Sequence, residues 1–506
     1  MANRRAFMPT SASALAAAWA ATHGAQAAGN QEAGRPPNVL WIMGDQHRAQ
    51  ALSCMGDPNL ETPNLDALGG AGASAVAGCP LCTPFRGSML TSRYPHECCP
   101  GHDRAMPEGM PTVAHAFNEA GYTTAWFGKW HVDGRIHRQE GMHPQKHFVR
   151  PERRGGFDMW VGYENNNAQW DCWVHGHGLG GDAIEMYQLP KYETDALADL
   201  FIDFLNDRGR DQAQGRGQPF FAALSVQPPH APYKAPEEWM ARHTPEDVEL
   251  RPNVPAIGRI QRESRRNLAG YYAMIEDLDW NVGRIVETLD KQGLRDNTII
   301  VFFSDHGDMH GSQGRIWKCV PWEESLRMPF LVSKGGKPLR QDEAPWTSLV
   351  NHVDLAPTTL GLCGIDVPEG MRGFDYSPLL LHRGLGKPDA SPPDSAFIQL
   401  VDPGEKFGYA ADRERPWRGV VTGDGWKYAA IEGQPWLLYD LNEDPYELDN
   451  RAWDGRYRAK RKELQDRLAA WIDDTGDSFD LPELWGWIGV RAGDVSSEAG
   501  PSWPRL

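Results

Sequence analysis

Four continuous apolar runs, separated by helical patterns, constrain the fold more than any other feature of this sequence. The runs are Asn38–Gly44, Thr123–Lys129, Phe220–Gln227 and Thr298–Ser304. Strands that are apolar on both faces are typical of parallel sheets buried between two layers of helices. The helical patterns are Pro63–Ala71, Pro84–Ser92, Pro111–Ala120, Thr194–Asp207 and Arg266–Lys291. This alternation predicts an α/β fold, with a large mixed, mostly parallel sheet sandwiched by helices.

Chemically active side chains gather where these runs end. In sheets of this kind ligands bind beyond the carboxyl ends of the strands, so we expect these side chains to share one site. They are Asp45, Lys129, His131, His230, Asp305 and His306.

The remainder of the chain predicts a second, smaller unit. Residues 386–395 are rich in Pro, Ser and Asp, which is typical of a linker. Short strand patterns follow at Gly419–Thr422, Trp426–Ile431 and Trp436–Asp440, and a helical pattern at Tyr457–Ile472. We therefore expect a large domain over 35–385 and a C-terminal α+β subdomain over 396–506, built from a small antiparallel sheet and a helix.

The first 34 residues resemble an export signal. Arg4-Arg5 and Phe7 precede a mild apolar run from Ala14 to Ala21, and Ala25-Gln26-Ala27 offers a cleavage site. A paired arginine before a weakly apolar run is typical of twin-arginine signals, which predicts an exported, periplasmic protein. The alternative is a disordered alanine-rich leader.

Composition excludes several classes of protein. The chain holds 51 Lys and Arg against 68 Asp and Glu, a formal charge of −17, which argues against nucleic-acid binding. An anionic substrate would therefore need local cations. After the leader the apolar stretches are only strand-length, so no membrane span is expected. Eight cysteines in 506 residues do not make a disulfide scaffold.

The segment from Cys82 to Arg86 is the strongest candidate for chemistry. It reads Cys-Thr-Pro-Phe-Arg, and Pro84 suits the first turn of a helix. Cys82 would then lie at a helix N-terminus, where free N–H groups favour an anion, with Arg86 on the same face. Cys79 and Cys82 also form a C-x-x-C pair, which alone could be a redox pair or half a zinc site. A second C-x-x-C is missing from the sequence, and redox chemistry does not explain the Pro-x-Arg.

At these residues the sequence resembles the sulfatase family, whose signature for converting cysteine to formylglycine is Cys-x-Pro-x-Arg followed by Leu-Thr. The likeness runs in order from about residue 37 to 450. Further matching segments are Asn38–Gln46, Thr62–Asp66, Gly121–Thr124, Gly128–His131, Pro229–Pro232, Ser304–Gly307, Lys318, Leu438–Leu441, Asp444-Pro445 and Asn450.

The resemblance implies an alkaline-phosphatase-like fold and a mechanism. Cys82 would be converted to an aldehyde by a formylglycine-generating enzyme and then hydrated. One hydroxyl would attack sulfur with help from a metal, and the second would expel sulfate, with His131 as the base. His230 or Lys318 would supply a proton to the leaving alcohol, and Lys129 and Arg86 would hold the diol and the sulfate. His310 is implied as a further sulfate contact.

The resemblance also implies a metal site. Its ligands would be Asp45, Gln46, Asp305, His306 and the modified Cys82. Oxygen ligands favour Ca²⁺. Many sulfatases have a second Asp where Gln46 stands and Asn where His306 stands, which leaves room for Mn²⁺ or another divalent metal. These two departures resemble phosphonate monoester and phosphodiester hydrolases of the same fold.

Three functions remain open on the sequence. The first is a sulfatase acting on a sulfate ester of a small molecule or saccharide, and the second is a phosphonate monoester or phosphodiester hydrolase with the same nucleophile. The third is a non-catalytic carbohydrate-binding relative in which Cys82 stays a thiol. The positively charged segment 135–154 could grip a polyanion or be a solvated loop, and Trp170 and Trp173 could bind a sugar or be packing residues.

Overall fold

The computed structural model describes residues 34–69, 74–102, 104–134, 144–339, 349–381, 391–403 and 415–483. The predicted export signal lies outside these ranges, apart from residue 34, and so do residues 135–143 of the positively charged segment. The first half of the expected linker, 386–390, is also outside them. The predictions on these segments stay predictions.

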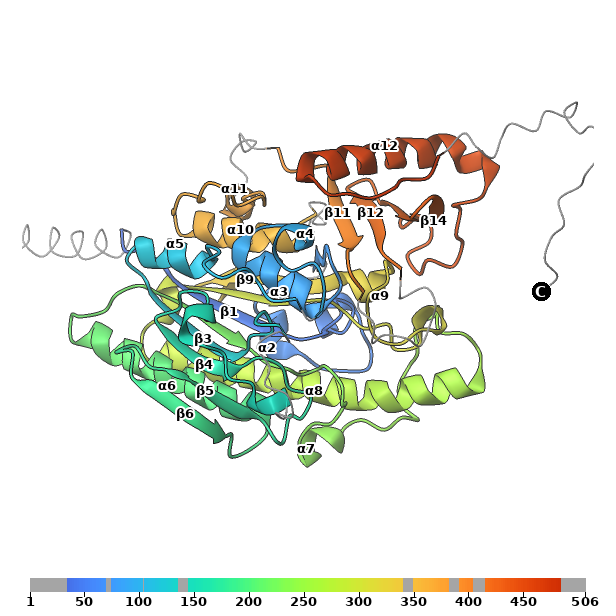
Figure 1. The fold of residues 1–506 in the computed structure, drawn as a ribbon. Helices are drawn as coiled ribbons and strands as arrows, with labels where there is room; N and C mark the ends of the chain where they lie inside the picture. The colour runs from blue at the N-terminus through green and yellow to red at the C-terminus, as the bar shows by residue number, and fades with distance from the viewer. Residues whose placement is uncertain are drawn as a thin grey trace, which may run out of the picture.

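A ten-stranded sheet forms the centre of the molecule (Figure 1). Its strands lie in the order β10-β9-β8-β1-β7-β3-β4-β5-β6, and β2 pairs with β9. The five central strands, from β8 to β4, run parallel, and antiparallel strands extend both edges. The bounds are β1 Asn38–Gly44, β2 Ser74–Val76, β3 Thr123–Lys129, β4 Met159–Tyr163, β5 Trp173–His177, β6 Ala183–Gln188, β7 Phe220–Ser225, β8 Thr298–Ser304, β9 Arg327–Lys334 and β10 Lys337–Pro338. The predicted sheet is confirmed.

Helices cover both faces of this sheet, because its central strands are apolar on both sides. On one face, Trp41 of β1 meets Phe221 and Phe303 edge-on, with ring centroids 5.0 and 5.4 Å away, under α3, α5 and α10. On the other face, Leu40 and Ile42 pack with α2, α6 and α8. The helix bounds are α2 Pro63–Asp66, α3 Cys82–Thr91, α4 Pro95–Cys98, α5 Val113–Glu119, α6 Glu193–Ala213, α7 Glu237–Met240, α8 Gly258–Lys291, α9 Glu323–Leu326, α10 Leu355–Leu362, α11 Ser377–Leu381 and α12 Arg458–Thr475.

A four-stranded antiparallel sheet, covered by α12, lies beside the large one (Figure 1). Leu464 and Leu468 of α12 pack against one of its faces. Its other face carries Ile398 and Trp417, which share an apolar cluster with Leu81, the residue before α3. The bounds are β11 Ser395–Leu400, β12 Trp417–Thr422, β13 Trp426–Ile431 and β14 Gln434–Asp440. The small sheet is therefore packed directly against the start of the helix that carries Cys82.

None of the helices in the described ranges is both long enough and apolar enough to cross a bilayer.

A buried histidine beneath α3 predicts how stability responds to acid. His352 is inaccessible to solvent and its ring stacks on Phe85 of α3 at 5.4 Å. Burial lowers its pKa to about 3, from an ordinary value near 6.5. Below about pH 6.5 the unfolded chain therefore binds a proton that the folded chain cannot, so stability that is present above this pH is lost as the pH falls toward 3.

We expect His352→Asn to flatten this dependence by up to about 1.4 kcal/mol per pH unit between about pH 6 and pH 4. Urea unfolding of both proteins across this range measures it. At pH 7.5, where His352 is neutral in both the folded and the unfolded chain, the difference in the free energy of unfolding between the two proteins reports the packing cost of the substitution alone. Parallel stability curves for the two proteins would contradict the assignment.

Candidate active site

The ends of neighbouring parallel strands bring the first acidic groups together. Gly44 of β1 pairs with Ser304 of β8 in parallel register, so the residues that follow each strand are neighbours. Asp45 and Asp305 are both inaccessible to solvent. The backbone N–H of Gln46 donates to Asp305 Oδ1 at 2.9 Å, which ties the two strand ends. The edge of the sheet predicted from the sequence is the edge that holds this cluster.

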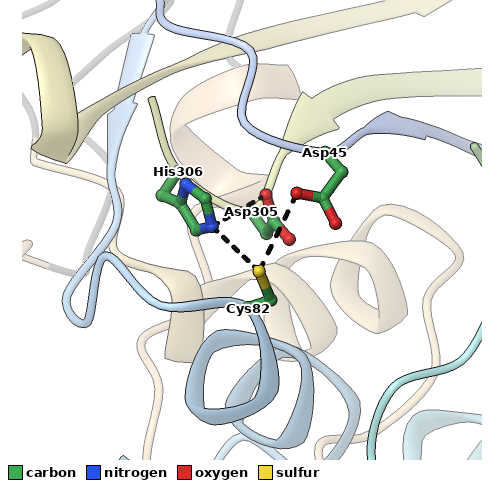
Figure 2. A group of neighbouring side chains, drawn as sticks. All are labelled: Asp45, Cys82, Asp305 and His306. Carbon is green, nitrogen blue, oxygen red and sulfur yellow. Dashed lines mark hydrogen bonds and ion pairs between the residues drawn. The ribbon is translucent and has the colours of Figure 1, made fainter. Parts of the chain in front are cut away.

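Cys82 faces these carboxylates from the first residue of α3. Its Sγ lies 3.8 Å from Asp45 Oδ1 and 3.3 Å from His306 Nε2 (Figure 2). Only 1% of Cys82 is exposed. One donor atom from each of Asp45, Cys82, Asp305 and His306 lies within 4.8 Å of the others. Two carboxylates, a sulfur and an imidazole thus converge on a single point.

The donor chemistry of this group fits a divalent cation. His306 Nδ1 lies 3.0 Å from the carbonyl oxygen of Gly307, which fixes the tautomer and leaves Nε2 as the acceptor that faces the cluster. Gln46 Oε1 is buried and has no hydrogen-bond partner within the described structure. A buried oxygen without a partner is costly unless an ion satisfies it. Oxygen atoms suit Ca²⁺, and the imidazole nitrogen also admits transition metals.

Three buried cations surround the same point. Arg86 lies 3.2 Å from Asp305 and 3.3 Å from Asp45, Lys129 Nζ lies 2.5 Å from Asp45, and Lys318 Nζ lies 2.9 Å from Cys82 Sγ. Burial acts to raise the pKa of Asp45, but Lys129 and its other cationic neighbours hold that pKa well below the ordinary value. The pKa of Cys82 is lowered in the same way, because the nearby cations outweigh burial and the repulsion from Asp45. The site therefore favours negative charge on the group at its centre.

A cavity of about 390 Å³ opens above Cys82. Burial lowers the pKa of His230 to about 3, helped by Lys318, and burial together with Lys129 holds the pKa of His131 well below its ordinary value. Both imidazoles are therefore neutral near pH 7 and can accept a proton. The lining residues are Gln46, Cys82, His102, Lys129, His131, Asn165, Asn167, His230, Ala231, Pro232, Trp317 and Lys318.

The structure brings together every predicted site residue except one. Gln46, Cys82, Lys129, His131, His230 and Lys318 line the cavity, and Asp45, Arg86, Asp305 and His306 contact them or Cys82 directly. His310 is placed elsewhere. It packs against Tyr233 and Tyr271, with ring centroids 4.9 and 4.3 Å away, and is not part of the cavity lining. Its predicted contact with sulfate stays a prediction.

The other half of the C-x-x-C pair faces away from this chemistry. Cys79 belongs to the apolar cluster with Ile398 and Trp417, and burial together with Cys319 raises the pKa of its thiol well above the ordinary value. A thiol in such surroundings is a poor nucleophile. The structure therefore gives the redox interpretation no support.

Four residues of the cavity wall were missed by the sequence analysis, namely His102, Asn165, Asn167 and Trp317. Asn165 and Asn167 follow β4, so the rule that located the other residues at strand ends applies to them as well. They were missed because β4 itself was not recognised as a strand. His102 carries no comparable signal in the sequence.

Comparisons with known proteins agree with this arrangement. A family model described as sulfatase matches residues 37–365, and one described as N-sulphoglucosamine sulphohydrolase, C-terminal, matches residues 311–474. An ulvan-active sulfatase from Formosa agariphila is 33% identical over 457 residues, which cover 88% of this chain and 82% of that protein.

Solved structures share the fold. The yidJ sulfatase from Bacteroides fragilis has a TM-score of 0.75 at 28% identity, with 88% of this chain and 97% of that chain covered. The phosphonate monoester hydrolase of Agrobacterium radiobacter has a TM-score of 0.66 at 24% identity, with 87% and 96% covered, a likeness of fold alone. Family match, relative and site agree, and the chain belongs to the sulfatase family of the alkaline-phosphatase-like superfamily, a family of sulfuric ester hydrolases.

Proposed function

We propose that this sulfatase hydrolyses a sulfate ester of a saccharide, using a formylglycine made from Cys82 and one divalent metal ion. The observation that carries the proposal is the position of Cys82 Sγ, between the Asp45–Asp305–His306 group and the ammonium of Lys318. The relative active on ulvan supports a carbohydrate as the leaving group. Ca²⁺ is the proposed ion, with Mn²⁺ as the alternative that His306 admits.

The position of each residue in the site suggests its role in the proposed reaction. Hydration of the aldehyde would supply the hydroxyl nucleophile. Asp45, Gln46, Asp305, His306 and residue 82 would hold the ion, which would supply Lewis acidity. Lys129 and Arg86 offset the negative charge that gathers at the centre. Burial and Lys129 keep His131 neutral, so its ring is available to accept a proton as the base. Lys318 is a protonated ammonium on the cavity wall and can protonate the leaving oxygen, whereas His230 is neutral and can do so only after it has taken up a proton.

Maturation and export complete the proposal. A formylglycine-generating enzyme would modify Cys82, since the aldehyde does not arise from the chain alone. The paired arginines Arg4-Arg5, the apolar run that follows and the Ala25-Gln26-Ala27 site support export to the periplasm. The division into a catalytic domain over 35–385 and a C-terminal subdomain over 396–506 is proposed with it, and the two separate sheets support that division.

A comparison of kcat/KM on an aryl sulfate and an aryl phosphonate monoester with the same leaving group tests the reaction. Sulfate is expected to be preferred by at least about tenfold, or about 1.4 kcal/mol of transition-state stabilisation. A preference for the phosphonate would contradict the proposal and favour the hydrolase function that Gln46 and His306 first suggested. Sulfate release from sulfated saccharides, against the aryl sulfate, then tests the leaving group.

A further inference from the structure

Asp308, a buried carboxylate beside the site, accepts hydrogen bonds from several groups that matter to the proposed function. Its Oδ2 lies 2.5 Å from Gln46 Nε2 and 2.6 Å from the hydroxyl of Tyr233. Its Oδ1 accepts from the backbone N–H groups of His310 and Trp317, at 3.1 and 3.0 Å. Asp308 is inaccessible to solvent, and the imidazole Nε2 of His310 lies 3.3 Å from its Oδ2.

We infer that Asp308 is a positioning residue that sets which end of the Gln46 amide faces the metal site. A carboxylate can only accept hydrogen bonds, so the atom of Gln46 against Asp308 has to be the NH₂ group. The amide oxygen is thereby turned the other way, and Oε1 is the atom of Gln46 that is buried without a hydrogen-bond partner in the described structure. An amide nitrogen has no lone pair to offer a cation, whereas the oxygen has.

The arrangement also accounts for the missing charge at position 46. Gln46 is neutral, so the group of metal ligands has one negative charge fewer than a site with a second Asp there. Asp308 supplies that charge one residue further out, through the 2.5 Å hydrogen bond to Gln46. A carboxylate at position 46 would instead repel Asp308. The two residues are thus a matched pair, and Asp308 also holds the backbone beside Lys318 through Trp317.

The variant Asp308→Asn tests the proposed orientation of the Gln46 amide directly. The oxygen of the new asparagine is expected to keep the two backbone N–H donors, because a buried N–H without an acceptor is strongly unfavourable. Its NH₂ group would then face Gln46, whose amide has to flip and present NH₂ to the metal site. Asp308→Asn is therefore expected to weaken metal binding by about 10- to 100-fold, the usual effect of losing an outer partner of a ligand.

The experiment is a calorimetric titration of Ca²⁺, and separately Mn²⁺, into the chelator-treated full-length protein. Tyr233→Phe is the matched control, since it removes a hydroxyl that contacts both Asp308 and Gln46 but keeps the Asp308 carboxylate that the Gln46 NH₂ faces. It is expected to change affinity less than about threefold. In the double variant Gln46→Glu/Asp308→Asn, the new carboxylate at position 46 accepts from the new amide at position 308 and directs its second oxygen to the ion. Affinity is therefore expected to return to within about tenfold of the original.

The inference rests on the proposed metal site, and the titration separates the two. If the unaltered protein binds neither ion, the proposed function fails. If it binds an ion and Asp308→Asn binds equally well, the positioning role is overturned while the proposed function stands. Should Asp308→Asn not fold, the double variant decides, because a loss of binding in a folded double variant overturns the paired role of the two residues.

Discussion

Replacing Cys82 by alanine is expected to reduce sulfate release by at least about 10³-fold, because it removes the nucleophile and leaves only the binding groups of the cavity. The fold should survive, since the side chain is small and α3 is held by apolar contacts of Phe85, Met89 and Leu90. Turnover of an aryl sulfate measures the loss, and circular dichroism checks the fold.

Cys82→Ser is the matched variant for the same position. A serine hydroxyl can attack sulfur, but it has no second hydroxyl to expel the sulfate, so we expect a covalently sulfated protein that does not turn over. Mass measurement of the peptide that holds residue 82 detects this adduct, and in the unaltered protein it detects the aldehyde. Full activity in Cys82→Ala, or a plain thiol in active protein, would remove the proposed nucleophile.

Removal of divalent metal by a chelator is expected to abolish activity to a similar degree and to lower the melting temperature. Asp45 and Asp305 are buried beside Cys82 and pair with Arg86 and Lys129, and a bound ion would add positive charge next to the nucleophile. An ion that binds only the folded chain stabilises it by about 2.7 kcal/mol at a hundredfold excess over Kd. Readdition of Ca²⁺, followed by thermal unfolding and activity, measures both effects.

Two variants test whether the rise in melting temperature on addition of Ca²⁺ comes from binding at this site. Asp305→Asn is expected to lose the Ca²⁺-dependent rise in melting temperature. Asp394→Asn, which alters a carboxylate whose side chain is 73% exposed, is expected to keep it. A chelator-treated protein that is fully active, or equal responses in both variants, would contradict the assignment of the metal ligands.

The central strands of the large sheet were predictable because their burial on both faces leaves a clear pattern in the sequence. β1, β3 and β8 begin and end at the predicted residues, since strands buried on both faces show as unbroken apolar runs. The site followed from the same rule: parallel strands end at one edge, which is where Asp45, Lys129 and Asp305 meet. The rule of strand ends reaches neither Cys82 nor Lys318. Cys82 followed from its expected place at a helix N-terminus, and Lys318 came from the resemblance alone.

The antiparallel edges were not predictable in the same way. β6 is exposed or half-buried along its whole length, so its apolar residues do not form a run. β4 is short and was overlooked, and the two asparagines after it were overlooked with it. A sequence motif does not predict what surrounds a side chain in space, and His310 is an example. Its spacing along the chain does not indicate that Tyr233, Tyr271 and Asp308 surround its ring. The role of Asp308 likewise depends on which amide atom faces it.

The contact between the small sheet and the start of α3 bears on when Cys82 can be modified. Trp417 of β12 donates its indole N–H to the carbonyl of Cys319, at 3.0 Å, and packs in one cluster with Leu81. A ribosome adding about 5–20 residues per second takes on the order of tens of seconds to travel from Cys82 to Trp417. Throughout that interval the apolar cluster that packs on Leu81, the residue before Cys82, is incomplete. The late position of β12 in the chain therefore leaves the start of α3 without these apolar partners during the time in which the proposed modifying enzyme would meet Cys82.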